Sequence, residues 1–243
     1  VGKYVTLADS YVSVNHALKH AGASIGGPVK IDLIDSETLN GNISTRDNYG
    51  GILVPAGFGT RGADGIIDTA NYAREKNIPF FGICLGMQIA VIEYARNCIR
   101  LSKANSTEFH KNTPNPVIAL VTEWKNYKGK KIKADQVNYG GTMRLGAQTC
   151  NLSQNSLAFK MYNKKTITER HRHRYEFNNC YRDLFERNGL ILSGLSPDNN
   201  LVEITEVADH PWMVGSQFHP EFQSKPLDPH PLFRTFIQKA WMQ

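Results

Sequence analysis

The chain has 243 residues, of which 41 % are hydrophobic and 21 % are charged, a composition typical of a globular domain with its own core. It contains no apolar run close to the roughly 20 residues that a membrane-spanning helix needs, and its first residues do not resemble a signal peptide. A net charge of +6 would suit a nucleic-acid partner, but the basic residues are spread along the chain with only two dense clusters.

The first hundred residues alternate between strand and helix signals. Residues 1–9 and 29–35 read as strands, and 50–59 read as a short apolar strand that runs into a glycine-rich loop. A helix is predicted over 63–77, a buried strand over 78–83 and a second helix over 85–97. This order of elements implies a parallel sheet with helices on both faces.

The rest of the chain is richer in strands. Extended segments are predicted at 116–120, 141–150, 189–197, 200–207 and 212–222, and helices at 181–188 and from Pro231 onward. One basic cluster, 125–133 (KNYKGKKIK), reads as a solvated hairpin tip. No repeat or linker divides the chain, so we expect one α/β domain over 1–243, with a mostly parallel central sheet covered by helices on both faces.

The spacing of the cysteines bears on metal binding and on the redox state of the compartment in which the protein works. Cys84, Cys98, Cys150 and Cys180 form no CxxC pair and no Cys/His set at zinc spacing, so no metal site is expected. Scattered thiols without a secretory signal indicate reduced cysteines and a cytoplasmic protein. The chain starts inside a predicted strand and without Met, so we expect it to be a piece of a longer protein.

Cys84 stands between a predicted strand and a predicted helix, in the segment FFGICLGMQIA. Gly82 and Gly86 flank it in the G-x-nucleophile-x-G pattern of a sharp strand-to-helix elbow. The helix N-terminus favours a thiolate, and the amide of Leu85 would face a developing oxyanion. The alternative is a packed structural thiol.

The segment SQFHPEF supplies a candidate base. His219 follows an apolar strand, and Glu221 lies two residues later, on the same side of an extended segment. This arrangement fits a nucleophile, a base and an orienting carboxylate. The loop VPAGFGTRG supplies a second oxyanion donor at the amide of Gly57, and it is not a Walker A loop because no Gly-Lys-[Ser/Thr] follows.

Together these stretches resemble the triad-type, class I glutamine amidotransferases. The resemblance is closest to the glutaminase domains of CTP synthases, through LVPAGFGTRG, CLGMQIAVIEYARN, GGTMRLGAQ, ERHRHRYEFNN and HPWMVGSQFHPEF, and it covers nearly the whole chain. It implies a flavodoxin-like fold of the class I glutamine amidotransferase type. The family usually has Pro-Gly-Gly-Phe-Gly where this chain has Ala56 before Gly57, which leaves open whether residue 56 needs a positive φ.

The resemblance also assigns roles to individual residues. Cys84 would be the nucleophile, His219 the general base and acid, and Glu221 its orienter. Gly57 and Leu85 would form the oxyanion hole. The substrate would be held by Gly57, Leu85, Gly86, Met87, Gln88, Glu108 and Arg174, the arginine meeting the α-carboxylate of glutamine. His171, Arg172 and His173 receive no role.

The implied partners are L-glutamine and a covalently linked synthetase domain. That domain, absent from this chain, would use ATP and magnesium; GTP would be an activator, and the parent enzyme would be a homotetramer. No cofactor, nucleic acid or membrane is expected for this domain itself. Three alternatives stay open: a γ-glutamyl hydrolase or cysteine peptidase of related fold, a basic nucleic-acid-binding module, and a catalytically silent interaction domain.

Overall fold

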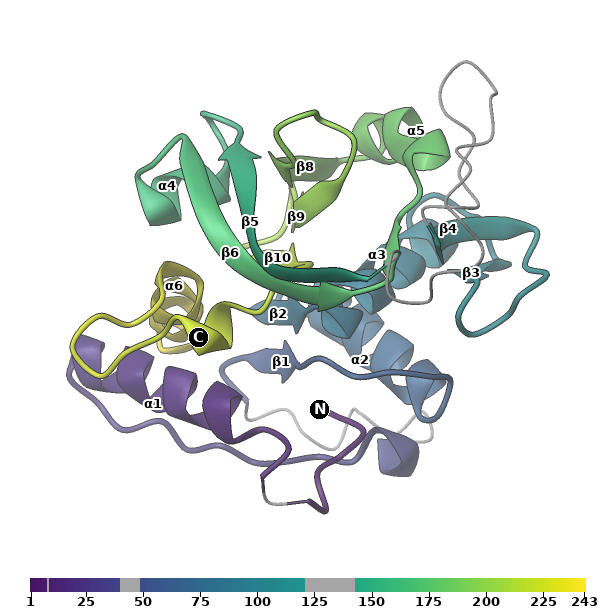
Figure 1. Cartoon of the computed structure of the whole chain (residues 1–243). Coiled ribbons are helices and arrows are strands. Elements are labelled where there is room, and N and C mark those ends of the chain that lie inside the picture. Colours follow the sequence, from purple (N-terminus) through teal and green to yellow (C-terminus); the bar gives the residue numbers. More distant parts are fainter. Residues whose placement is uncertain (8, 40–48, 121–142) are drawn as a thin grey trace.

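The computed structural model describes residues 1–7, 9–39, 49–120 and 143–243. Six α-helices, ten strands and several short 3-10 turns follow one another within these residues (Figure 1). The helices are α1 (Val12–Ile25), α2 (Ala63–Glu75), α3 (Leu85–Asn97), α4 (Leu157–Tyr162), α5 (Arg182–Arg187) and α6 (Pro231–Ala240). The strands are β1 (Ile52–Val54), β2 (Phe80–Ile83), β3 (Ala104–Ser106), β4 (Asn115–Leu120), β5 (Arg144–Leu152), β6 (Thr166–His173), β7 (Tyr175–Phe177), β8 (Leu190–Leu195), β9 (Val202–Val207) and β10 (Met213–Ser216).

The central sheet has seven strands in the order β1-β2-β10-β9-β8-β5-β6. Parallel pairing joins β1 to β2 and β2 to β10, while the pairs from β10 through β9, β8 and β5 to β6 are antiparallel. A second, three-stranded sheet has the order β3-β4-β7. The predicted α/β fold class is therefore confirmed. In the central sheet the parallel pairing is confined to β1, β2 and β10, and in the second sheet β3 and β4 are also parallel.

Helices cover both faces of the parallel part of the sheet (Figure 1). On one face, Phe80 of β2 packs into a core with apolar residues of α2 and α3. On the other, its neighbour Phe81 packs with Trp212, Phe233 and Phe236, so that α6 and α1 close this side. Adjacent residues of a strand point to opposite faces, which explains why both of these phenylalanines are fully buried.

Some predicted elements differ from the structure. Segments 1–9 and 29–35 meet only in a single bridge between Gly2 and Asp35, because the chain turns between Tyr4 and Leu7 instead of continuing a ladder. The helix α1 was not predicted. The basic segment 125–133 lies outside the described residues. None of the helices in the described ranges is both long and apolar enough to cross a bilayer.

The parallel strands decide where the functional residues meet. Since β1, β2 and β10 run in the same direction, the residues that follow them emerge at one edge of the sheet. These are the loop after Val54, Cys84 after Ile83, and Gln217 and His219 after Ser216.

Candidate active site

Cys84 occupies a sharp turn between β2 and α3. Its backbone has φ of 53° and ψ of −100°, a conformation that non-glycine residues rarely adopt. Its amide donates a hydrogen bond of 2.7 Å to the carbonyl of Ser216, the last residue of β10. The chain therefore holds the thiol at the N-terminus of α3 in the elbow that the glycine spacing predicts.

The two flanking glycines allow the strand and the helix to approach closely. A Cβ at Gly82 would lie 2.5 Å from the backbone of Gly86, and a Cβ at Gly86 would lie 2.2 Å from the carbonyl oxygen of Val54. Neither distance is possible for a real side chain, so both positions require glycine.

His219 and Glu221 form a buried pair. Nδ1 of His219 lies 2.8 Å from Oε1 of Glu221, and the amide of His219 donates to the carbonyl of Arg170 on β6. The carboxylate can only accept, so Nδ1 carries the proton and Nε2 faces away from the pair. Nε2 is buried and makes no hydrogen bond within the described part of the chain.

The way in which Glu221 reaches the histidine differs from the prediction. The strand β10 ends at Ser216, and residues Pro220–Phe222 form a 3-10 turn rather than an extended segment. Proline is favoured at the first position of a helical turn because its fixed φ suits that position. The turn brings the carboxylate back to the ring, so the predicted contact forms by a different local geometry.

The interactions around His219 favour its protonated form. Burial lowers the pKa of His219, but the interactions of its ring with Cys84 and Glu221 outweigh burial and raise the pKa to about 10. The site therefore favours a positively charged His219 ring next to Cys84 and Glu221.

Gln217 is a neighbour of the thiol that the sequence analysis missed. Its Nε2 lies 3.7 Å from Sγ of Cys84, and its Oε1 accepts a hydrogen bond of 3.2 Å from Nε2 of Gln88. Gln88 is held in turn by the carbonyl of Tyr175, at 3.0 Å. Because Gln88 donates to its oxygen, the amide of Gln217 is oriented with its NH₂ group toward the sulfur. The signal for this residue was its place directly before Phe218 and His219.

The loop after β1 is held in place by charged residues. Glu108 accepts a hydrogen bond of 2.6 Å from the amide of Gly59, and the ammonium of Lys3 donates to the carbonyls of Phe58 and Gly59. Burial lowers the pKa of Lys3 to about 8, and burial raises the pKa of Glu108 against the opposing effects of Gly59 and Lys3. Ala56 is absent from the described residues with positive φ, so the alanine costs no strain there.

The remaining predicted site residues lie at different depths. A Cβ at Gly57 would lie 2.9 Å from the side chain of Leu85, so these two residues are neighbours. The side chain of Met87 is fully buried in the core, which leaves only its backbone for a substrate. Arg174 is partly buried between β6 and β7.

A cavity of about 460 Å³ adjoins the pair of His219 and Glu221. Gly57 and His171 also line it, together with parts of segments 4–14, 55–58, 170–172 and 219–222. Cys84 is 3 % exposed and is not among the residues that line this cavity. The cavity reaches the catalytic site through the wall formed by Gly57, His219 and Glu221.

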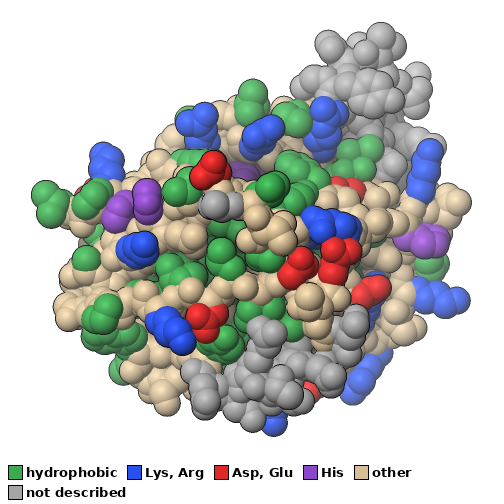
Figure 2. Space-filling model, turned by 90° about the horizontal axis from the view of Figure 1, so that it is seen from below, with side chains coloured by type: hydrophobic (Ala, Val, Ile, Leu, Met, Phe, Trp, Pro, Cys, Tyr) green, Lys and Arg blue, Asp and Glu red, His purple; other side chains and the backbone are tan. Residues whose placement is uncertain are grey.

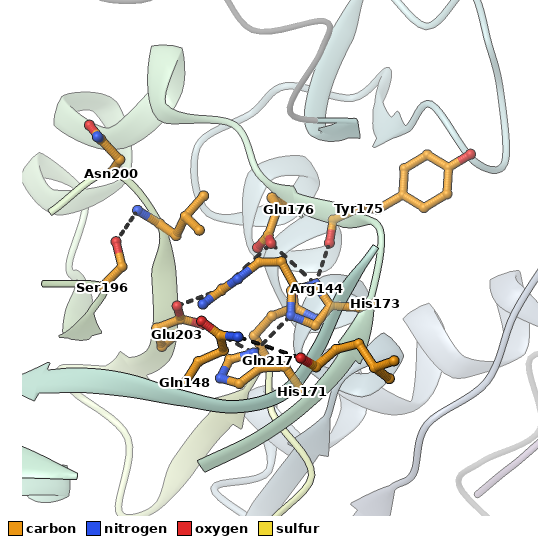
Figure 3. A network of polar contacts seen from close by, with 12 residues as sticks. Arg144, Gln148, His171, His173, Tyr175, Glu176, Ser196, Asn200, Glu203 and Gln217 are labelled. Carbon is orange, nitrogen blue, oxygen red and sulfur yellow. Dashed lines mark hydrogen bonds and ion pairs between the residues drawn. The ribbon is translucent and has the colours of Figure 1, made fainter. Parts of the chain in front are cut away.

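The segment ERHRHRYEF forms the second half of β6 and the whole of β7, and its residues alternate in burial along β6. Glu169, His171 and His173 face inward, while Arg170 and Arg172 face outward. Figure 3 shows that the inward histidines belong to a network with Arg144, Glu176 and Glu203. The basic cluster therefore consists of a buried row of glutamate and histidine side chains and an exposed row of arginine side chains on the same strand.

The chain matches known proteins over almost its whole length. It is 52 % identical over 249 residues to the CTP synthase of Lawsonia intracellularis, an alignment that covers 99 % of this chain and 44 % of that protein. The chain therefore spans less than half the length of this curated relative. The structure is similar to the glutaminase domain of Trypanosoma brucei CTPS with bound acivicin, with a TM-score of 0.86, 35 % identity and coverage of 100 % of this chain and 92 % of that one.

A more distant structural match concerns the fold alone. A protein named as a GMP synthase component from Thermoplasma acidophilum superposes with a TM-score of 0.58 at 18 % identity, over 94 % of this chain and 88 % of that one. The model of the family described as glutamine amidotransferase class-I matches residues 6–239. With the cysteine elbow and the histidine–glutamate pair in place, the chain belongs to the class-I glutamine amidotransferase family.

Proposed function

We propose that this chain is the glutaminase domain of a CTP synthase and that it hydrolyses L-glutamine to glutamate and ammonia. The observation that carries the proposal is the position of Cys84 at a strained elbow, beside a buried histidine whose other nitrogen is held by Glu221. The similarity to the Lawsonia CTP synthase and to the trypanosomal glutaminase domain supports the choice of substrate.

In the proposed reaction the thiolate of Cys84 attacks the side-chain amide carbon of glutamine. The imidazolium of His219 gives its proton to the leaving ammonia, and a γ-glutamyl thioester remains. Neutral His219 then takes a proton from water, which attacks the thioester and releases glutamate and the thiolate. Glu221 holds the ring in one tautomer throughout, as the orienting carboxylate of a triad does.

The neighbouring residues support binding and charge stabilisation. The amides of Gly57 and Leu85 are the proposed oxyanion donors, and such a donor is worth a few kcal/mol of the barrier. Arg174 and Glu108 are proposed to bind the α-carboxylate and the α-ammonium of glutamine, with the backbone of Gly86 and Met87 alongside. Gln88 acts through Gln217, because its side-chain amide is already bound there.

The whole parent protein would carry a synthetase domain that uses the ammonia. There the ammonia would react with a phosphate-activated UTP to give CTP, with ATP and magnesium bound in that domain and GTP as an activator. We further propose that the parent enzyme is a cytoplasmic homotetramer. The match to less than half of the curated relative supports a second, linked domain.

The alternative functions, a nucleic-acid-binding module and a γ-glutamyl hydrolase or peptidase, predict a different surface or different products. On the face seen in Figure 2, Lys and Arg side chains are interspersed with acidic and apolar ones rather than gathered into one patch, which disfavours a nucleic-acid surface on that face. Products from free glutamine and from γ-glutamyl peptides separate a glutaminase from a γ-glutamyl hydrolase or peptidase.

Replacing the nucleophile tests the proposal. Cys84→Ser should lower glutaminase turnover by at least about a thousandfold while the fold stays intact, because a serine hydroxyl at this elbow is a far weaker nucleophile than a thiolate. Ammonia release and circular dichroism are the measurements, with Cys180→Ser, an exposed cysteine, as the matched control. Near wild-type ammonia release by Cys84→Ser would exclude this residue as the nucleophile.

The protonation state of His219 is a second prediction. Its ring should remain protonated at about pH 8 and lose the proton around a pKa of about 10. In Cys84→Ser the pKa of His219 should fall, because burial still lowers it and only Glu221 is left to raise it. Imidazole ¹⁵N NMR titrations of both proteins measure this. Titration near the ordinary value of about 6.5 in the native protein would contradict a histidine that its neighbours hold protonated.

Gln217 should stabilise the thiolate. Gln217→Leu removes the N–H donor at a similar size, and a hydrogen bond to a charged group contributes about 1.5–3 kcal/mol, so alkylation of Cys84 at neutral pH should slow by about 10- to 100-fold. The pH profile of alkylation should move to higher pH, while Gln154→Leu, at an exposed position between β5 and α4, should leave it unchanged. An unshifted profile in Gln217→Leu would show that the amide does not act on the sulfur.

A further inference from the structure

Two histidines that the catalytic site does not use lie in a buried cluster beside it. His171 and His173 occupy alternate positions of β6 and point inward, where they meet Glu203 of β9. Figure 3 shows these three side chains converging, with Arg144 and Glu176 next to them. All three are nearly or fully inaccessible to solvent.

The cluster has the geometry of a small metal site. His171, His173 and Glu203 each offer one ligand atom, and these three atoms all lie within 4.8 Å of one another. Nδ1 of His171 lies 2.9 Å from Nε2 of His173 and 3.7 Å from Oε2 of Glu203. Ligand atoms around a tetrahedral zinc ion, with bonds of about 2.0–2.2 Å, lie about 3.3 Å apart. The two separations that involve Nδ1 of His171, 2.9 and 3.7 Å, lie on either side of that value.

The second nitrogen of His173 fixes the form of its ring. Nδ1 lies 3.2 Å from the carbonyl oxygen of Tyr175, which can only accept a hydrogen bond, so Nδ1 carries the proton. Nε2 therefore presents its lone pair to the cluster. Metal-binding histidines are held in this way, by a carbonyl or carboxylate on the nitrogen that faces away from the ion.

The carboxylate ligand is supported from behind as well. Nη1 of Arg144 binds Oε1 of Glu203 at 2.6 Å and lies 3.6 Å from Oε1 of Glu176. Oε2 of Glu203 and both oxygens of Glu176 are buried without a hydrogen bond inside the described ranges. Two carboxyl groups thus share one guanidinium, and Nδ1 of His173 also lies 3.2 Å from Oε1 of Glu176.

The charged groups of the cluster are two carboxyl groups and one guanidinium. Arg144 is the one arginine that contacts Glu203 and Glu176 among the described residues, and it approaches both carboxyl groups. A bound cation would add a second positive charge beside these two buried carboxyl groups.

We propose that His171, His173 and Glu203 form a binding site for a transition-metal ion of the zinc class, with Glu203 held by Arg144 and His173 by the carbonyl of Tyr175. Two imidazoles and one carboxylate favour zinc over magnesium or calcium, which prefer oxygen ligands alone. The ion replaces the hydrogen bond between the rings, and the ring proton of His171 moves from Nδ1 to Nε2, which has no partner at present. The ion enters from the cavity that His171 lines.

The test uses the metal ion alone on protein treated with a chelator. In a Cys84→Ser background, which removes the thiolate as a competing ligand, Co²⁺ should bind with the visible spectrum of a tetrahedral N/O site, and Zn²⁺ should displace it. His173→Asn and Glu203→Gln should each weaken Zn²⁺ binding by at least about 10- to 100-fold in calorimetry. Crystals soaked in Zn²⁺ should show an anomalous peak between the three side chains.

A surface pair of histidines provides the matched control. His16 and His20 lie one helical turn apart on α1 with ring centroids 6.2 Å apart, and such a pair can chelate a metal ion by itself. His16→Asn should leave the spectrum and the affinity unchanged. Binding that disappears in His16→Asn, or that persists in His173→Asn, would overturn the proposal. So would crystals with an ordered water and no anomalous signal at the cluster, a result that does not depend on whether the variants fold.

Discussion

The sharp turn between β2 and α3 constrains the rest of the site. Cys84 adopts a backbone conformation that costs of order 1–3 kcal/mol, and the packing of Gly82 against Gly86 and of Gly86 against Val54 maintains it. The same turn fixes the amide of Leu85 at the start of the helix and the direction of the thiol. Because β2 is paired on both sides, by β1 and β10, its end cannot move without breaking two parallel ladders.

The strand β6 connects the catalytic pair to the polar cluster behind it. The carbonyl of Arg170 on this strand accepts the amide hydrogen bond of His219, and the ring of the next residue, His171, packs against Phe218 with centroids 5.7 Å apart. A metal ion bound by His171 and His173 would therefore tie β6 to β9 at the level where β6 supports the catalytic histidine. The outward arginines of the same strand remain on the cavity side, since Arg170 and Arg172 line it.

Much of this arrangement could be predicted from sequence because the informative patterns are local. The glycine spacing around Cys84 predicts the elbow, and the alternation of apolar strands and helices over 50–97 predicts the order of β1, α2, β2 and α3. Gln217 was missed because an amide has no chemistry of its own, and its contact with a thiol 133 residues away appears only in the folded chain. Likewise, the sequence spacing of His171 and His173 places them on one face of a strand. It does not predict their contact with Glu203, which belongs to another strand.

Other features depend on long-range pairing that local patterns do not contain. The antiparallel side of the sheet arises because β8, β9 and β10 follow one another through short connections, while β5 and β6, which are joined through α4, pair antiparallel at the far edge. The first residues look like a strand by composition, yet only Gly2 finds a bridging partner. The carboxylate of Glu221 reaches His219 through a turn begun by Pro220, which the i, i+2 rule for strands does not describe.

The most direct test of the central claim is mass spectrometry after exposure to an electrophile that mimics glutamine. A single covalent adduct should form on the peptide that contains Cys84, and excess L-glutamine should protect it, because the thiol is nucleophilic and lies at a glutamine site. An adduct on the exposed Cys180 or the partly exposed Cys98 instead, or labelling that glutamine does not slow, would contradict the account.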